Sequence, residues 1–449
     1  MADTYLTRQT TVPTSEKTHT FSTWLKKSRV SGDDQGVVQW FRDTDTRWQL
    51  LFDSSASALR FYSKESGTLK VDYKTKNLYR DPSAWMHICY QCDTTNAVSG
   101  DRLKMWINGE QITDWETETN DYAHNVNINC FDGTSGDDVE IGIRNTTPAF
   151  QGIMAETYYI DGSLIAYSQF GETDSTSGIW VPKLDPTISS YGNAGFYLKY
   201  ANSSDLGEDS SGNDLDMTVT GTGKRTKDTP SNNFATLNPL TKDAGGAKTY
   251  SYGNTKVAET ANSWTGAHSS LAVSAGKWYF ETKVTYTSSD EAYVGCSSVP
   301  EINAKTNSTF YIGQGGSIGY YTSNGDITKD SATTSSYGSA VTSGQIMGVA
   351  LDITNELAYF SINGVWQNSA DPVAGSGGVA FPSGMTGGEF ICFSMSPNQS
   401  YLECNFGNGY FGVTAVTSSN ADDAGIGEFE YDVPTGYYTL CTNNIATYG

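Results

Sequence analysis

Two stretches of alternating polarity that end in the same turn sequence restrict the fold more than any other feature of this chain. Residues 103–113 read LKMWINGEQIT, and residues 357–367 read LAYFSINGVWQ. In each stretch, apolar residues alternate with others until an Asn-Gly pair is reached, at 108–109 and at 363–364. An Asn-Gly pair accepts the positive φ angles of a type I′ turn, so alternation that runs into it predicts a β-hairpin.

Similar alternating runs, separated by Gly, Ser, Thr, Asn and Asp, recur along the whole chain and predict an all-β protein. The 28 Tyr suit strands and the 46 Gly supply turns, and no long amphipathic helical pattern interrupts them. A chain of 449 residues is too long for one ordinary core. We therefore expect two β-sandwich, jelly-roll-like domains in series with a short exit segment after each.

The changes in pattern along the chain give the expected boundaries. Residues 1–13 are polar and form a possible anchor arm, and residues 14–220 form the first sandwich. Residues 221–248 form a linker that packs partly on a domain through Phe234 and Leu237. Residues 249–412 form the second sandwich and residues 413–449 a C-terminal tail. The tail sequence DVPT, at residues 432–435, is similar to the linker sequence DTPS, at residues 228–231. The rest of the two sandwich sequences does not align.

The charge of the chain excludes some partners. A net charge of −22 argues against binding to nucleic acid, because such binding requires a basic protein surface. It also argues against docking on anionic lipid. No apolar run approaches the roughly 20 residues of a membrane span, and the N-terminus shows no apolar secretory signal. We expect no membrane insertion and no nucleic-acid partner.

The seven cysteines do not form a metal or redox motif. Cys89 and Cys92 are the one C-x-x-C pair, but they lie in an apparent strand, where residues three apart point to opposite faces. We expect buried free thiols.

Motifs for catalysis are weak. The G-x-S-x-G string at residues 315–319 lacks the following helix of a nucleophile elbow, so we interpret it as a turn. Glu116 and Glu118 are the nearest candidates for a glycosidase carboxylate pair, but they lie in a loop-like stretch without the usual aspartate between them. The sequence predicts no enzyme.

The sequence leaves calcium binding as an alternative, because acidic turns offer the hard oxygen ligands that calcium prefers. The candidate metal ligands are Asp132, Asp137 and Asp138, and a second acidic group lies within residues 205–216. Neither has the spacing of an EF-hand loop, and solvated turns are the alternative. No cofactor other than calcium is expected.

Aromatic residues near polar turns could stack on the apolar faces of sugar rings. In the first domain the ligand-binding candidates are Trp115 and Tyr122, and in the second they are Tyr320, Tyr321 and Trp366. The alternative for each is packing in a core.

Several longer motifs occur in a characteristic order. The stretches TFSTWLKKS, LKMWINGEQIT, GIMAETYYIDG and FGETDSTSGIWVPK lie within residues 14–220. This region resembles the laminin-G-like, concanavalin-like lectin domains of marine bacteriophage structural proteins. Residues 249–412, with GKWYFETKV, YVGCSS, SIGYY, GVALDITNELAYFSINGVWQ and LECNFG, resemble a SPRY domain.

The resemblance implies a non-enzymatic phage virion structural protein, in a capsid or tail fibre-like appendage on the virion surface, made in the host cytoplasm. Its implied partners are other virion proteins and a host-surface glycan or receptor, and its implied state is a homo-oligomer such as a trimer. The chain has neither coiled-coil heptads nor a repetitive β-helix, so we expect a compact spike or decoration. The alternatives are a connector that binds only neighbouring virion subunits and a glycan depolymerase.

Overall fold

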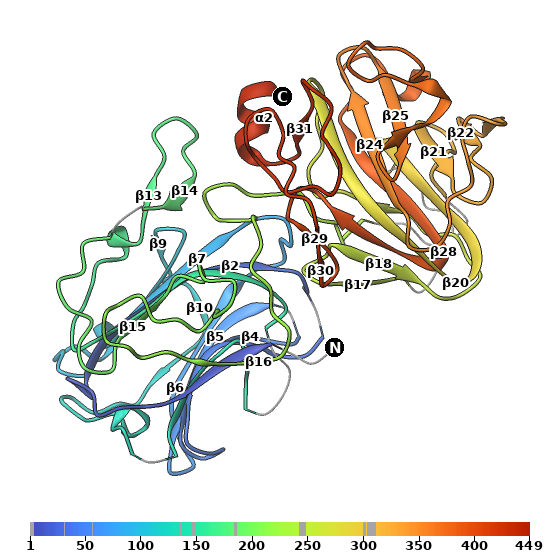
Figure 1. Cartoon of the computed structure of the whole chain (residues 1–449). Helices are drawn as coiled ribbons and strands as arrows, with labels where there is room; N and C mark the ends of the chain where they lie inside the picture. Colours follow the sequence, from blue (N-terminus) through green and yellow to red (C-terminus); the bar gives the residue numbers. More distant parts are fainter. Residues whose placement is uncertain are drawn as a thin grey trace. The chain divides into compact units, whose positions relative to one another are not determined.

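The computed structural model describes residues 4–30, 32–55, 57–134, 136–145, 150–183, 186–241, 248–299, 302 and 311–449. It is an all-β structure, as the sequence predicts, and it divides into two compact units, residues 1–225 and 226–449 (Figure 1). Within the described part of the chain, no helix is both long and apolar enough to cross a membrane.

Two antiparallel sheets and one hairpin make up the first unit. The eight-stranded sheet has the order β10 (Trp115–Asn120), β6 (Thr68–Leu78), β5 (Ala58–Glu65), β4 (Arg47–Phe52), β3 (Gln35–Phe41), β11 (Asp138–Ile141), β1 (Tyr5–Gln9) and β16 (Thr218–Thr220). The six-stranded sheet has the order β15 (Phe196–Leu198), β12 (Gly152–Asp161), β2 (Thr18–Lys27), β7 (Met86–Asp93), β8 (Leu103–Ile107) and β9 (Glu110–Gln111). A separate hairpin pairs β13 (Gly171–Thr173) with β14 (Trp180–Pro182), and its loop projects from the unit in Figure 1.

The core of the first unit is rich in aromatic rings. Phe21, Trp40, Trp48, Phe61 and Tyr90 are all buried in one apolar cluster. Alternation along each strand sends every second side chain into this cluster, which is how two sheets form a sandwich. The first unit is therefore a β-sandwich with its core between the sheets.

One curled sheet dominates the second unit. Its main path is β17 (Thr249–Ser251), β18 (Lys256–Glu259), β28 (Ile391–Asn405), β20 (Lys277–Ser298), β21 (Ser317–Tyr321), β22 (Ile327–Lys329) and β23 (Ala332–Thr334). Further strands pair beside this path: β19 (Ala267–His268), β24 (Ile346–Asp352), β25 (Leu357–Ile362), β26 (Val365–Trp366), β27 (Val379–Ala380) and β31 (Tyr438–Thr439). A separate hairpin joins β29 (Tyr410–Phe411) to β30 (Thr414–Ala415), and α2 (Thr442–Tyr448) closes the chain.

The long strands β20 and β28 give this sheet its curvature. Their pairing shifts register between Tyr286 and Glu291, and an irregularity of this kind bends a strand and increases its twist. The first part of β20 pairs with β24, and the last part pairs with β21. The sheet thus folds over one large apolar cluster that includes Trp278, Phe280 and Phe393.

Both predicted hairpins are confirmed. The turn between β8 and β9 has Asn108 at φ 49° and Gly109 at φ 79°, and the turn between β25 and β26 has Asn363 at φ 46° and Gly364 at φ 77°. The structure also places Cys89 and Cys92 in different apolar clusters on opposite faces of β7. The seven cysteines are free and buried.

The structure differs from the expected boundaries at the two ends of the chain. Residues 1–13 do not lie wholly outside the first sandwich, because β1 pairs with both β11 and β16. The linker packs on a domain through Phe234 and Leu237, as the sequence predicts, because both side chains are buried in the second unit. The tail joins the same unit through β31, which pairs with β20.

The two similar exit segments lie together rather than one after each sandwich. Phe234 forms a β-bridge with Cys441, and the Ala235 amide donates to the Leu440 carbonyl at 2.9 Å. Both segments therefore belong to the second unit, where apolar residues of each fill one core.

Candidate functional site

The candidate calcium ligands Asp132 and Asp137 of the first unit form ion pairs with Arg42. Arg42 Nε donates to Asp137 at 2.6 Å, and its NH2 group donates to Asp132 at 3.0 Å. The hydrogen bond to Asp137 is the main reason that the pKa of Arg42 lies above its ordinary value. Asp138 is not part of this ion pair; burial and the neighbouring Asp137 raise its pKa. Calcium at this loop would have to displace the guanidinium group.

Replacing Arg42 with alanine is expected to lower the free energy of unfolding by about 3 kcal/mol, because the fully buried Asp137 would lose its counter-charge. Urea denaturation monitored by circular dichroism measures this change. Arg42→Lys keeps the positive charge but lacks the planar pair of donors. Its free energy of unfolding should therefore lie between those of the native chain and of Arg42→Ala. Equal stability of Arg42→Ala and the native chain would contradict the prediction.

The second acidic group caps turns of its own chain. Asp209 accepts hydrogen bonds from the backbone amides of Tyr197, Ser211 and Leu215, each at 2.9 Å, and Asp216 accepts from the amide of Asp209 at 2.8 Å. Across the described ranges, no group of three or more His, Cys, Asp or Glu side chains has an arrangement that could hold a metal ion.

The five aromatic candidates lie in different surroundings. Tyr122 and Tyr320 are buried, and their hydroxyls bond to Ser63 at 2.8 Å and to the Ser339 carbonyl at 2.5 Å. Trp115 and Trp366 are half-buried and pack against Tyr73 and Tyr279. The structure brings none of these four together.

Tyr321 differs from the others because it belongs to a cluster of rings on the outer side of the second unit. The cluster consists of Trp264, Tyr293, Tyr311 and Tyr321, and we call it the aromatic surface. Trp264, Tyr311 and Tyr321 are half-buried. Tyr293 stacks on Tyr311 and on Tyr321, with 4.9 Å between ring centroids in both pairs, and Trp264 lies 5.1 Å from Tyr293.

Strand alternation creates this surface. Along β20, Ala292 and Val294 enter the large core, so Glu291 and Tyr293 face the other way. Tyr321 of β21 lies directly opposite Tyr293 in the antiparallel pairing, which is the position where cross-strand rings meet. The loops before β19 and before β21 add Trp264 and Tyr311.

A carboxylate with fixed orientation borders the aromatic surface. Glu291 accepts the Tyr321 hydroxyl hydrogen bond on Oε1 at 2.9 Å and the Asn398 amide hydrogen bond on Oε2 at 2.7 Å. Burial, followed by this bond to Glu291, raises the pKa of Tyr321 to about 12. Aromatic faces and fixed polar groups thus lie side by side.

Sequence reasoning found Tyr321 but missed the other residues of this site: Trp264, Tyr293, Tyr311 and Glu291. Alternation in EAYVGCSS could have placed Glu291 and Tyr293 on one face. No local pattern joins Trp264 to Tyr321, because 57 residues separate them in the chain and only the folded sheet brings them together.

The buried Ser–His pairs do not form a nucleophile and base. Trp180 Nε1 donates to His87 Nδ1 at 3.2 Å, so Nε2 carries the ring proton and donates to Ser22 Oγ at 2.8 Å. In this tautomer His87 cannot accept the serine proton. His268 contacts Ser394 at 2.8 Å, and both side chains are buried.

The other catalytic candidates are placed as follows. Ser317 of the G-x-S-x-G string opens β21 in a buried position and accepts a hydrogen bond from the Gly313 amide at 2.7 Å. Glu116 and Glu118 are exposed on β10 at the edge of its sheet, and Glu116 pairs with Lys74 at 3.3 Å.

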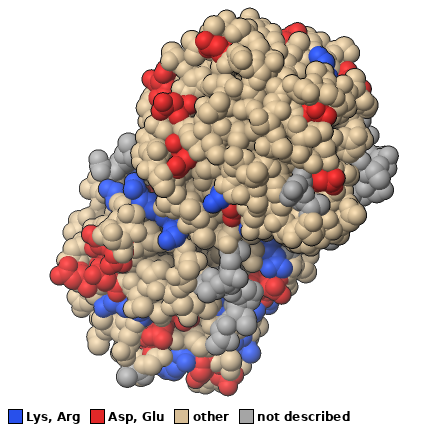
Figure 2. Space-filling view, turned by 45° about the vertical axis from the view of Figure 1, so that its right-hand side comes forward, with Lys and Arg blue, Asp and Glu red and all other residues tan. Residues whose placement is uncertain are grey.

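Charged side chains are spread over the surface. On the face shown in Figure 2, Asp and Glu side chains lie in scattered groups between wide areas that carry no charge. On this face the acidic side chains are thus distributed, and the uncharged areas between them are free for contacts with neutral ligands or proteins.

The fold and the candidate site together define an all-β chain of two compact units with an aromatic surface on the second. No protein-family model and no curated protein matches the chain. Solved structures do match. They include the SPRY domain of human HERC1, at 11% identity and a TM-score of 0.30, covering 37% of this chain and 96% of that one.

Two further matches are the PSpry domain of TRIM65 and a heptameric pentraxin from Limulus polyphemus. The first has 14% identity and a TM-score of 0.28, covering 38% of this chain and 91% of that one. The second has 13% identity and a TM-score of 0.27, covering 37% and 74%. SPRY domains are thus among the matched structures.

Proposed function

We propose that this chain is a non-enzymatic virion structural protein that binds a host-surface glycan through its aromatic surface. The observation that carries the proposal is the group of four rings on the outer side of β20 and β21, beside Glu291. The phage origin comes from the motif order in residues 14–220, and the binding role comes from this geometry.

The geometry suits a sugar for two physical reasons. The C–H face of a sugar ring is apolar and packs on an aromatic face, as Trp264 and Tyr321 would allow. A carboxylate held by two hydrogen bonds keeps further lone pairs for sugar hydroxyls, and Glu291 is such a group. Both kinds of contact are available at one place on a single unit.

Replacing Trp264 with alanine is expected to weaken binding to the recognised polysaccharide about tenfold, because a ring contact of this size contributes roughly 1.4 kcal/mol. Tyr321→Phe keeps the ring and removes its bond to Glu291, so we expect a smaller loss. The measurement is binding of the purified, labelled chain to a panel of bacterial cells and surface polysaccharides, followed by titration of each variant.

A matched control is Tyr62→Ala, which removes a half-buried ring from the first unit. It should leave binding unchanged, and thermal melting should show that all variants fold. If binding were saturable and Trp264→Ala did not weaken it, the glycan would bind elsewhere on the chain and the proposed role of the aromatic surface would be wrong. No binding to any cell or polysaccharide, from a folded and assembled sample, would favour the connector that contacts only neighbouring virion subunits.

A further inference from the structure

The charged side chains that border the aromatic surface are acidic. Glu291 accepts a hydrogen bond from the Tyr321 hydroxyl. Asp326 lies in the turn between β21 and β22, where its carbonyl accepts from the Tyr321 amide at 2.8 Å. Burial is the main cause of the raised pKa of Tyr293, and the negative charges of Glu291 and Asp326 add to it. The rings therefore lie in a negative electrostatic field.

Both carboxylates have neutral hydrogen-bond partners. Glu291 accepts from a tyrosine hydroxyl and an asparagine amide, and Asp326 accepts from an asparagine amide and a backbone amide. In the described part of the second unit, no Lys, Arg or His side chain forms an ion pair with either of them, whereas the buried Asp352 pairs with Lys277 at 2.9 Å. A positively charged ligand would thus compensate charge that the described side chains leave uncompensated.

The rings of the aromatic surface are inclined to one another. The plane of Trp264 is tilted by 55° to Tyr293, by 46° to Tyr311 and by 56° to Tyr321. Rings inclined in this way let one compact group contact more than one ring face. The face of an aromatic ring is electron-rich and attracts an ammonium group. The rings and the carboxylates therefore favour the same charge on a ligand.

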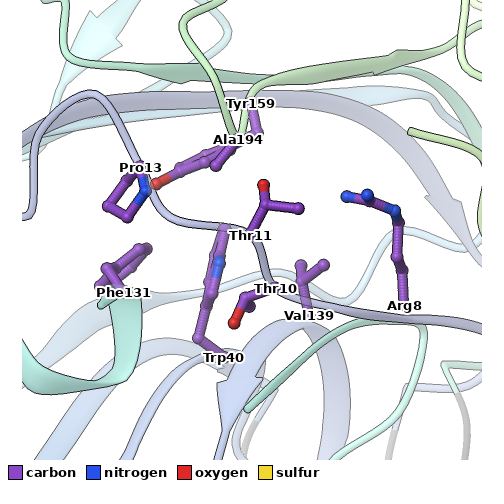
Figure 3. Close-up of a pocket in the computed structure, with 9 residues that line it drawn as sticks. All are labelled: Arg8, Thr10, Thr11, Pro13, Trp40, Phe131, Val139, Tyr159 and Ala194. Carbon is purple, nitrogen blue, oxygen red and sulfur yellow. The ribbon is translucent and has the colours of Figure 1, made fainter. Parts of the chain in front are cut away.

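The aromatic pocket of the first unit differs from this surface in size and in charge. Trp40, Phe131 and Tyr159 line it, with 4.7 Å between the ring centroid of Trp40 and each of the other two (Figure 3). Its cavity of about 10 Å³ has room for about one water molecule. Arg8 also lines the pocket, and its positive charge would repel an ammonium group. An ammonium ligand is therefore expected to bind at the aromatic surface and not in this pocket.

We propose that the aromatic surface selects glycans that carry a free ammonium group, such as sugars with an unacetylated amino group. The ammonium group contacts the inclined faces of Trp264 and Tyr321 and pairs with Glu291. The net charge of −22 attracts such a polymer to the chain and repels an anionic polysaccharide. This selectivity rests on the proposed glycan binding and specifies the charge of the glycan.

Two tetrasaccharides with the same ring and the same linkage test the selectivity: the tetramer of glucosamine, which carries ammonium groups, and the neutral tetramer of N-acetylglucosamine. Isothermal titration calorimetry on the full chain at pH 6 measures both affinities, in about 0.15 M salt to screen the general attraction of the acidic chain. The glucosamine tetramer should bind about tenfold more tightly than the neutral one.

In Glu291→Gln the ratio of the two affinities should fall to about threefold, because the rings still attract the ammonium group. The ratio is the quantity to compare, since a loss that affects both tetramers equally leaves it unchanged. The matched control is Glu389→Gln, which removes the same charge from a half-buried side chain of the second unit outside the aromatic surface. This control should keep the tenfold ratio.

Three results would overturn the selectivity: equal affinities for the two tetramers in the native chain, the same ratio in Glu291→Gln as in Glu389→Gln, or no binding of the glucosamine tetramer at about 10 mM. If a bacterial polysaccharide bound and Trp264→Ala weakened it while the two tetramers bound equally, glycan binding would stand and the charge selectivity alone would be wrong. If no cell or polysaccharide bound but the tetramer ratio behaved as expected, the ammonium site would stand without the proposed host-glycan function.

Discussion

Acidification from pH 6.5 to about 4 is expected to destabilise the first unit by several kcal/mol. This unit contains two fully buried histidines, His19 and His87, and burial lowers the pKa of each to about 3. An unfolded chain protonates these rings near pH 6.5, whereas the folded chain does not. The stability they contribute is present above pH 6.5 and is lost as the pH falls toward 3, at about 3 kcal/mol for each histidine by pH 4.

His19 has the clearest physical reason for this behaviour. It stacks on Phe131 at 4.5 Å and lies among the rings of Trp48, Tyr90 and Tyr159, and neither ring nitrogen has a hydrogen-bond partner. A proton on this ring would place an unpaired charge among aromatic side chains. The imidazole is therefore held neutral.

Thermal and urea denaturation at several pH values between 7 and 4 test this expectation. His19→Phe should keep the stability at pH 7 and reduce the loss on acidification by about half in this unit. His124→Gln, at an exposed site, should change nothing. If His19→Phe lost stability on acidification as steeply as the native chain, the buried imidazole would not be responsible.

Replacing Glu281 with alanine is expected to lower the stability of the second unit by about 3 kcal/mol. This fully buried carboxylate on β20 accepts hydrogen bonds from the backbone amides of Glu430 at 2.9 Å and Tyr431 at 2.8 Å. The Tyr279 hydroxyl donates to it at 3.2 Å. Alanine would leave these donors without an acceptor and would release residues 430–431 from their contact with β20.

Glu281 contributes to the second unit a pH dependence of the opposite sign, while the buried His268 of the same unit, whose pKa burial lowers to about 3, acts in the same direction as His19. Burial raises the pKa of Glu281 from 4.5 to about 7, against the lowering effect of the two backbone amides. The folded carboxyl group holds its proton more tightly than the unfolded one, so the stability it contributes is present below pH 4.5 and is lost as the pH rises through 7. Glu281→Gln should remove this dependence and, with one acceptor oxygen left, destabilise less than alanine.

Chemical denaturation of Glu281→Ala and Glu281→Gln at pH 4.5, 6 and 7.5 separates the loss of the hydrogen-bond acceptor from the loss of the pH dependence. Trp115→Ala, which alters the first unit alone, controls for a general loss of stability. If Glu281→Ala unfolded at the same denaturant concentration as the native chain, the carboxylate would not hold residues 430–431.

The hairpins show how far local sequence could predict the fold. The conformation at Asn108-Gly109 and Asn363-Gly364 depends on the preference of two neighbouring residues, so the sequence contains all the information that the turn needs. The opposite orientation of Cys89 and Cys92 likewise follows from the two-residue period of a strand.

Domain boundaries were harder to predict for a physical reason. The polar N-terminal stretch and the irregular segment around Phe234 lack alternation, but their backbone and apolar groups still find partners far along the chain. β1 pairs with β11 and β16, and Phe234 meets Cys441. Pairing of this kind depends on contacts between distant residues, which no local pattern records.

The sequence by itself determined the fold class, the two hairpins and the faces of individual strands, because each depends on residues within one or two turns of each other. Only the tertiary structure decided which aromatic side chains are accessible. Tyr320 and Tyr321 are neighbours on β21, yet one is buried in the core and the other joins the aromatic surface with Trp264. Sheet curvature and loop closure bring distant rings together, and the contacts that fix both join residues far apart in the chain.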